Sequence, residues 1–151
     1  MHLTHKTLAY FLGLILVFTS QISRSDETSL YSRLGGIYPI ATVVDDFVEH
    51  VLANKTLNSN PALAAARQRV AKAGLKFQVT SFVAMATGGP EKYNGRSMVE
   101  THKNLNISEK EWQVMVQELK KTLAKFKVPV KEQQDLLALI GTTKADIVTH
   151  L

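Results

Sequence analysis

The segment from Gly88 to His102 constrains the fold more than any other part of the chain. Its opening run, Gly88-Gly89-Pro90, ends any helix that arrives from the N-terminal side, because glycine is entropically unfavourable in a helix and proline restricts the residue before it. From Met98 the chain can be helical again. At helical spacing His102 shares one face with the apolar side chains of Met98, Val99 and Leu105. The segment therefore directs a histidine toward the protein interior.

The rest of the chain predicts an all-α protein of five or six helices. Apolar residues recur at spacings of three and four in four segments, which are residues 40–52, 75–86, 112–126 and 136–148. A short amphipathic turn at 30–34 precedes the pair Gly35-Gly36, and Ser108 with Glu111 forms a capping box that begins a helix. The sequence predicts a loop at residues 54–61 and a short helix at residues 62–72, which Gly74 ends. The next helix is expected to begin at Leu75. Gly141 is a weak point in the last helix. Alternation of apolar and polar residues is nowhere sustained, so we expect no strand.

Composition excludes several classes of protein. A chain of 151 residues with 45% hydrophobic content can form one domain with a real core. The absence of cysteine excludes a disulfide framework, a zinc ribbon and covalent attachment of a c-type haem. The formal charge of +5 is spread without a dense basic block, which favours a solvated surface over nucleic-acid binding. No phosphate-binding loop, zinc-protease motif or nucleophile elbow is present, so any chemistry must come from a pocket between helices.

The first 25 residues predict an export signal. Positive residues precede an apolar run from Leu8 to Phe18, and small residues precede Asp26. We expect cleavage before Asp26, which leaves residues 26–151 as the domain, in the periplasm or outside the cell. Residues 1–25 hold two of the 18 basic residues and none of the 13 acidic ones, so the mature net charge is 16 − 13 = +3. The alternative is an uncleaved membrane anchor, but the apolar run is about half of the roughly 20 residues needed to span a bilayer.

Of the five histidines, His102 is the strongest ligand candidate. Two others lie in the export signal, His150 is near the C-terminus, and His50 lies toward a helix end, where a cation interacts well with the helix dipole. A single histidine on an apolar face is more often a hydrogen-bonded structural residue than a ligand. The residues alone therefore leave both interpretations open.

Several motifs together resemble a group 1 truncated haemoglobin. They are Leu30-Tyr31 with Leu34-Gly35-Gly36; Val43-Val44-Asp45-Asp46-Phe47 with Val51-Leu52-Ala53; Thr87-Gly88-Gly89-Pro90 with Tyr93, Gly95, Arg96 and Met98 before His102; and Leu105-Asn106-Ile107-Ser108. The resemblance runs from Leu30 to Val148, and its most specific part lies between Gly88 and Ile107.

The resemblance implies a two-over-two helical sandwich around haem b, with His102 as the proximal ligand to the iron. A neutral imidazole can bind iron while its other ring nitrogen donates to a backbone carbonyl. By position in the family pattern, the distal side would hold Val48, Leu75, Val79 and Phe82, with Phe47 behind them. The haem edge or proximal face would hold Met98, Ile107, Trp112 and Met115. The haem propionates would be met by Arg96, Lys76 or Gln78. Each of these residues also has an ordinary structural explanation, as a core residue or as part of a solvated face.

The chain departs from the family pattern on the distal side. Many members carry a tyrosine where Val48 stands, and valine cannot donate a hydrogen bond to bound oxygen. The segment from Leu57 to Gly74 contains no aromatic residue and is longer than usual. We therefore expect faster oxygen release and less discrimination against carbon monoxide than in tyrosine-bearing relatives, unless Gln78, Trp112 or Lys76 supplies a donor.

Three functions are consistent with these patterns. The first is a globin that binds oxygen, nitric oxide or carbon monoxide reversibly. The second is an enzyme of the same fold, a nitric oxide dioxygenase or weak peroxidase, which would need an external reductase. The third is a haem-free helical module that binds another ligand or partner in its apolar pocket.

Overall fold

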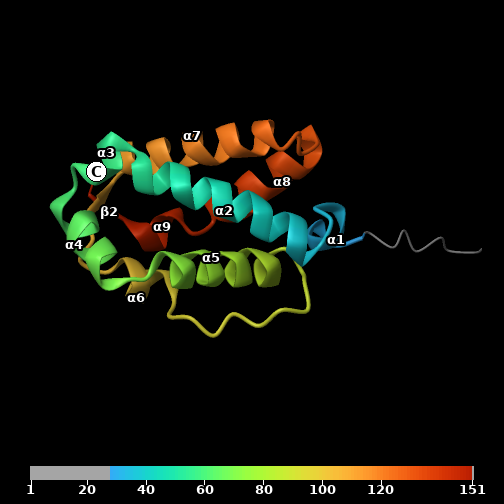
Figure 1. Ribbon diagram of the computed structural model, residues 1–151, viewed down its shortest axis with the longest axis horizontal. Coiled ribbons are helices and arrows are strands. Elements are labelled where there is room, and N and C mark those ends of the chain that lie inside the picture. Colours follow the sequence, from blue (N-terminus) through green and yellow to red (C-terminus); the bar gives the residue numbers. More distant parts are fainter. Residues whose placement is uncertain (1–27, 151) are drawn as a thin grey trace, which may run out of the picture.

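The computed structural model describes residues 28–150, and the predicted export signal lies outside this range. The described part of the chain is mostly helical, as predicted (Figure 1). The elements in chain order are α1 (Leu30–Arg33), α2 (Ile37–Ala53), α3 (Lys55–Asn58), α4 (Pro61–Arg69), α5 (Lys72–Ala86), α6 (Met98–His102), β1 (Ile107–Ser108), α7 (Glu109–Lys125), α8 (Val130–Gly141), α9 (Lys144–Ile147) and β2 (Val148–His150).

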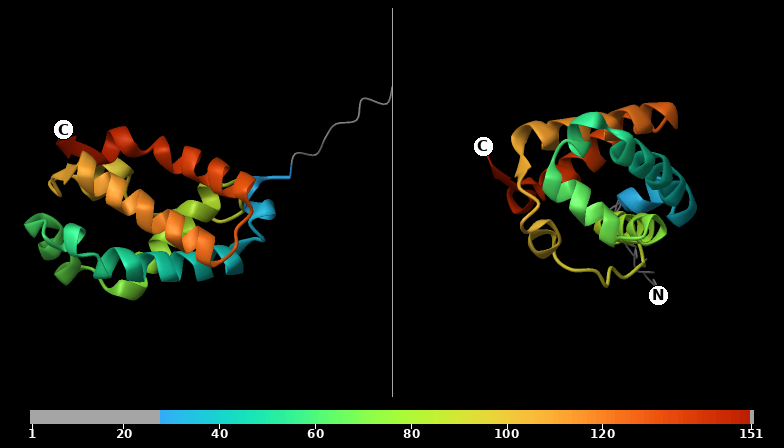
Figure 2. Two further views of the ribbon diagram at one scale, coloured as in Figure 1. Left: turned by 90° about the horizontal axis from the view of Figure 1, so that it is seen from above. Right: turned by 60° about the vertical axis from the view of Figure 1, so that its left-hand side comes forward.

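The long helices form two pairs. Helices α2 and α5 pack side by side, and α7 and α8 form the second pair, with α2 also packed against α7 (Figures 1 and 2). Their apolar faces form one core, whose buried members are Ile40, Val44, Val48, Val83, Leu119, Leu123 and Leu136. A second, smaller cluster contains Ile107, Trp112 and Ile147 and lies near α6 and α9. This arrangement agrees with the predicted two-over-two sandwich.

Both glycine pairs form the same helix C-terminal cap. Gly88 has φ +90°, its N–H donates to the carbonyl of Met85, and the N–H of Gly89 donates to the carbonyl of Ala84. This pattern is a Schellman motif, in which the left-handed residue is usually glycine. Gly35 and Gly36 form the same motif after α1. The sequence therefore predicted these two helix ends correctly.

Other boundaries differ from the prediction. Helix α5 begins at Lys72, so Gly74 lies in its first turn and does not end a preceding helix; α4 already ends at Arg69. The predicted loop 54–61 contains the single turn α3, which Asn54 caps by accepting from the N–H groups of Thr56 and Leu57. At Gly141 the last helix stops altogether, and α9 follows as a separate turn. At α3, side-chain capping by Asn54 supports a helical turn within a segment of turn-forming composition.

The expectation of no strand was also wrong. Strands β1 and β2 pair in parallel, with Ile107 opposite Val148, and form a two-stranded sheet. Each strand is two or three residues long, which is too short to show alternation in a sequence. The pairing joins the start of α7 to the C-terminal end of the described chain.

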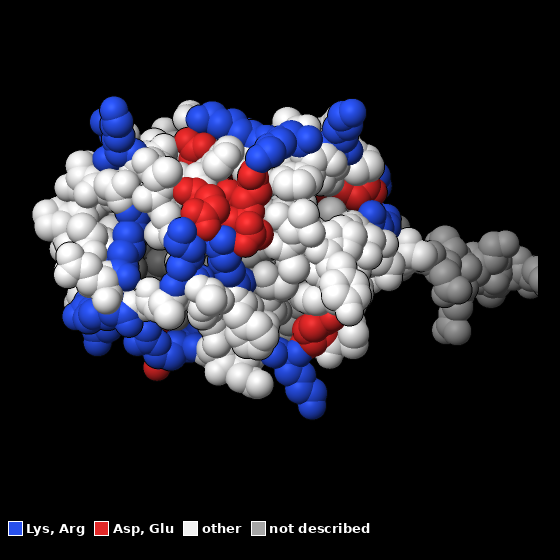
Figure 3. Space-filling model, in the orientation of Figure 1, with Lys and Arg blue, Asp and Glu red and all other residues white. Residues whose placement is uncertain are grey.

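Ion pairs cover the outer surface of α2 and α5. Lys76 Nζ lies 2.6 Å from carboxylate oxygens of both Asp45 and Glu49, and Lys72 lies 3.0 Å from Glu49. Figure 3 shows the acidic side chains gathered on this face with basic side chains beside them. Among the described residues, no helix is long and apolar enough to cross a membrane.

Candidate functional site

His102 is held by one ring nitrogen and leaves the other available. Its Nδ1–H donates to the carbonyl oxygen of Met98, one turn earlier on α6, at 2.9 Å. Within the described residues Nε2 makes no hydrogen bond, and the ring lines the large cavity of the protein. Burial lowers the pKa of His102, although the bond to Met98 partly opposes that shift. The imidazole is therefore neutral at pH 7, which is the form that binds metals.

A capping box holds the short helix that carries His102. The Ser97 hydroxyl accepts from the Glu100 N–H, and the Glu100 carboxylate accepts from the Ser97 N–H, both at 3.2 Å. A helix of five residues is not stable alone, so the cap and the packing of α6 against α9 must support it. This cap was not predicted from the sequence, although Ser97-Met98-Val99-Glu100 is the same Ser-x-x-Glu signal that begins α7 at Ser108.

The loop between α5 and α6 is fixed at both ends. Near its start, the Tyr31 hydroxyl donates to Glu91 Oε1 at 2.7 Å, and this bond raises the pKa of the Tyr31 phenol. Near its end, the Tyr93 hydroxyl donates to the carbonyl of Arg96 at 2.8 Å, while the Tyr93 ring meets the edge of Phe82 with centroids 5.5 Å apart. The arm that carries His102 is therefore anchored from α1 and from α5.

Tyr31 also brings the two glycine pairs together. Its N–H donates to the carbonyl of Thr87 at 2.8 Å, just before Gly88. A Cβ placed on Gly89 would lie 2.5 Å from the Tyr31 ring, and one placed on Gly36 would lie 3.7 Å from the Tyr31 hydroxyl. The Tyr31 ring therefore packs directly against Gly89 and leaves no room for a larger residue there. Through this contact, α1 packs on the cap that ends α5.

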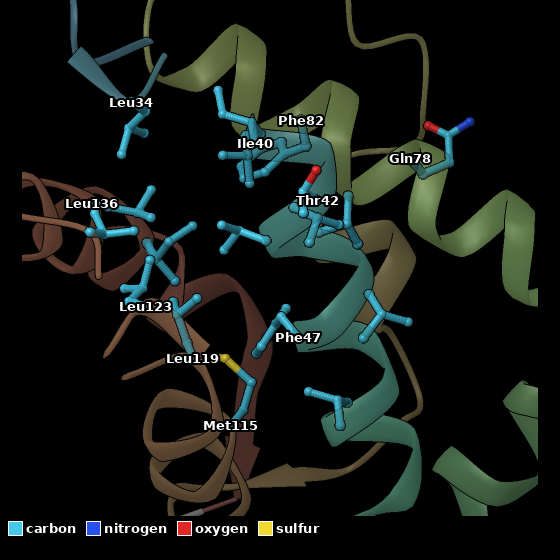
Figure 4. A pocket seen from close by; sticks show the side chains of 18 of the residues that line it. Leu34, Ile40, Thr42, Phe47, Gln78, Phe82, Met115, Leu119, Leu123 and Leu136 are labelled. Atoms are coloured by element: carbon cyan, nitrogen blue, oxygen red, sulfur yellow. The ribbon is translucent and has the colours of Figure 1, made fainter. Parts of the chain in front are cut away.

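The wall opposite α6 is apolar. A cavity of about 760 Å³ runs between the helices, a volume within the range of cofactor sites. Figure 4 shows side chains from α2, α5, α7 and α8 around it, with Ile40, Phe47, Leu119 and Leu123 facing a common space. No aspartate or glutamate is among its lining residues.

The structure places most of the predicted site residues around this cavity. Those that line it are Val48, Leu75, Val79, Phe82, Met98, His102, Trp112 and Met115. Phe47 and Gln78 line it as well, although Gln78 is exposed and extends away from the apolar side chains in Figure 4. Val48 is 3% exposed and lines the cavity, where it presents methyl groups and no polar side-chain atom.

Four predicted positions differ from their expected setting. Arg96 is exposed and does not line the cavity; its backbone carbonyl instead accepts from Tyr93. Ile107 is buried in the cluster with Trp112, outside the cavity lining, because β1 pairs with β2 there. Lys76 is engaged by the two carboxylates of α2, whose hydrogen bonds raise its pKa. Val99 is 52% exposed, so it does not belong to the apolar face of His102.

Tyr93 and Thr101 were not predicted as site residues, yet both line the cavity beside His102. Thr101 precedes the histidine, and its hydroxyl donates to the carbonyl of Arg96 at 3.3 Å. The sequence signal that could have identified Tyr93 is its position as an aromatic residue inside a turn-forming segment. Its place in the cavity follows from its contact with Phe82, which the sequence does not reveal.

Comparison with known families matches residues 29–149 to the bacterial-like globins. The fold, with a histidine on a short helix facing an apolar cavity between two helix pairs, defines the class as a globin. The match covers most of the chain, and the relatives below are group 1 truncated haemoglobins. The chain belongs to the bacterial-like globin family, within its group 1 truncated haemoglobins.

Curated relatives and solved structures support this assignment. The chain is 31% identical over 119 residues to the group 1 truncated hemoglobin GlbN of a Synechocystis species, a match that covers 76% of this chain and 87% of the relative. It is 27% identical over 130 residues to GlbN of Mycolicibacterium paratuberculosis, with 86% and 91% covered. The truncated hemoglobin of Tetrahymena pyriformis superposes with a TM-score of 0.65 at 26% identity, with 80% of this chain and 97% of that chain covered.

The residues present fit a haem. Haem iron in globins is bound by a neutral histidine, and His102 offers Nε2 at the wall of an apolar cavity. The hydrogen bond from Nδ1–H to Met98 fixes the tautomer, as a bond from the second ring nitrogen commonly does in metal-binding histidines. The lining contains no carboxylate, so an anionic porphyrin would meet no acidic side chain in the cavity. Family membership and this fit support a haem cofactor.

Proposed function

We propose that this protein binds haem b through His102 and takes up oxygen or another diatomic gas reversibly at the iron. The observation that carries the proposal is the geometry of His102: one ring nitrogen tied to Met98, the other available at an apolar cavity. Haem supplies the iron to which the gas binds. The chain supplies the axial imidazole, holds its orientation, and excludes water with apolar walls.

The distal wall supports weak retention of oxygen. Val48, Leu75 and Val79 line the cavity and offer no donor. Lys76 is held by Asp45 and Glu49, and Gln78 extends away from the apolar side chains. Trp112 lines the cavity from the separate cluster that it forms with Ile107 and Ile147. A hydrogen bond contributes about 0.5–1.5 kcal/mol, and more to a charged group, so its absence corresponds to roughly tenfold faster release. We infer fast exchange of the gas and weak discrimination against carbon monoxide.

The test is haem binding by three proteins: the mature chain, His102→Ala and His50→Ala. His50 is the matched control, because it is a half-exposed histidine on α2 that does not line the cavity. We expect the mature chain and His50→Ala to give the same haem spectrum. His102→Ala should bind haem at least tenfold more weakly, and added imidazole should restore the spectrum of a His102→Gly variant.

An unchanged spectrum and affinity in His102→Ala would show that another residue binds the iron. Failure of the mature chain to bind haem at all would favour the helical module that binds a different ligand. Turnover of nitric oxide with a supplied reductant separates a gas-binding globin from a dioxygenase.

We also propose that the chain acts outside the cytoplasm after cleavage before Asp26. The support is the sequence of residues 1–25 alone, in which positive residues, an apolar run and small residues follow in that order. Amino-terminal sequencing of the exported protein tests this proposal. A mature protein that retains Leu8 to Phe18 would indicate a membrane anchor instead.

A further inference from the structure

The cavity extends far beyond the neighbourhood of His102. Its lining includes Leu34 after α1, Ile40 in the first turns of α2, and Phe126 to Pro129 in the turn between α7 and α8. Figure 1 shows α1 and this turn at one end of the molecule and α6 at the other. In Figure 4, Leu34 and Leu136 border the end of the space that lies farthest from Met115. The remote end of the cavity therefore lies well away from the part that His102 lines.

The remote end combines an apolar interior with a polar mouth. Ile40, Leu123 and Leu136 are at most 5% exposed and form its walls. The exposed side chains of Tyr38, Phe126 and Lys127 also belong to the lining. An occupant can therefore keep one end in the core and the other in water.

The charge at this mouth is positive. Arg33 is paired with Glu132 at 3.1 Å and also with Asp135, so its charge is compensated. Lys127 has no ion pair among the described residues. It occupies the left-handed position of the cap that ends α7, with φ +54°, and its N–H donates to the carbonyl of Ala124. Because the cavity lining contains no acidic residue, Lys127 has no competing carboxylate there.

We propose that the remote end of the cavity is a second ligand site, which binds a medium-chain fatty acid with its alkyl chain between α2 and α8 and its carboxylate at Lys127. This proposal rests on the cavity and its charge and does not depend on haem binding. An alkyl chain matches walls of leucine, isoleucine and valine, and a single anionic head matches a single unpaired cation. A ligand with two charged ends would have to bury one charge in the apolar interior, which is strongly unfavourable.

Calorimetric titration of the haem-loaded protein with hexanoate, octanoate and decanoate tests the proposal. Each added methylene that enters the cavity should strengthen binding about fourfold. Lys127→Gln should weaken the binding of decanoate about two- to fivefold, in the range of an exposed ion pair. The matched control is Lys120→Gln, which removes an exposed lysine of α7 away from the cavity and should change nothing. Decanol, which has the same chain without the charge, should not respond to Lys127→Gln.

A second pair of variants locates the alkyl chain. Leu34→Phe should narrow the remote end and weaken the binding of decanoate more than the binding of hexanoate. Leu34→Ala should instead strengthen the binding of decanoate. Circular dichroism must show that both variants are folded, and their haem spectra should equal that of the parent. Absence of binding, equal affinity for the three acids, or equal loss in Lys127→Gln and Lys120→Gln would overturn the proposal. So would a shift of the haem absorption band on adding decanoate, because that would place the acid beside the iron.

Discussion

The two walls of the cavity are built by different physical means. The wall that carries His102 is held by directional polar bonds: the capping box of Ser97, the bond from His102 to Met98, and the bond from Tyr31 to Glu91. The opposite wall presents Val48, Leu75 and Val79, whose side chains are held by packing. The ion pairs that join α5 to α2 lie on its outer surface. Hydrogen bonds fix orientation, whereas apolar contact is non-directional.

The difference between the two walls implies a different role for each. An axial ligand must point one nitrogen at the iron, and the polar bonds around α6 supply that orientation. The apolar wall excludes water but offers no donor to a bound gas. Under the proposed function, the first wall would control retention of haem, and the second would control retention of the gas. Substitutions that exchange these properties test the assignment.

The largest effect is expected for Gly89→Ala. The added Cβ would lie 2.5 Å from both the Tyr31 ring and Glu91 Oε2, so the contact between α1 and the His102 arm must shift. Overpacking of this kind destabilises a protein by about 1–3 kcal/mol. Chemical denaturation of the haem-free chain measures the change. Equal stability would mean that Tyr31 moves away freely and does not anchor the arm.

The second effect is expected on the distal wall. Val48→Tyr introduces a hydroxyl at the cavity and should slow oxygen dissociation about tenfold, through one hydrogen bond to the bound gas. Val48→Phe is the control, because it adds nearly the same volume without the hydroxyl. Stopped-flow measurement of oxygen release compares the two. Similar rates in both variants would show that volume, and not the missing donor, determines release.

The third effect concerns the capping box on α6. Ser97→Ala removes the acceptor for the Glu100 N–H and should destabilise the short helix by about 1 kcal/mol. Because His102 ends this helix, haem should transfer to a scavenger about fivefold faster. Ser97→Thr keeps the cap and should behave like the parent. Oxygen release should change little in either variant, since Ser97 does not line the cavity.

Much of the His102 wall could be predicted because its signals are local. Gly88, Pro90 and the helical face of His102 lie within one short segment, and the cap at Ser97 was readable by the same rule that identified Ser108. The bond from Tyr31 to Glu91 was not readable, since the partners are 60 residues apart and no local pattern pairs them.

The opposite wall was predictable only as a set of apolar faces. Helical spacing identified Val79 and Phe82, but periodicity cannot distinguish a cavity wall from a filled core. The pairing of Lys76 with α2 and the extension of the cavity to Leu34 depend on how α2, α5 and α8 pack. The same limit hid the short pairing of Ile107 with Val148.

The smallest effect is expected for Gly74→Ala, which is the same substitution as Gly89→Ala but lies on the opposite wall. Gly74 lies in the first turn of α5, the helix that carries Leu75 and Val79, and a Cβ there would meet no atom within 4 Å. Its backbone lies outside the left-handed region, so alanine fits without strain and reduces the entropy of the unfolded chain. Gly74→Ala should therefore stabilise the protein by about 0.4–1 kcal/mol in the same denaturation experiment.

Opposite signs for the two Gly→Ala variants would confirm that the His102 wall is closely fitted while the start of α5 is not. A loss of stability in Gly74→Ala would instead show that α5 needs flexibility at its first turn, as the sequence had suggested by placing a helix end there.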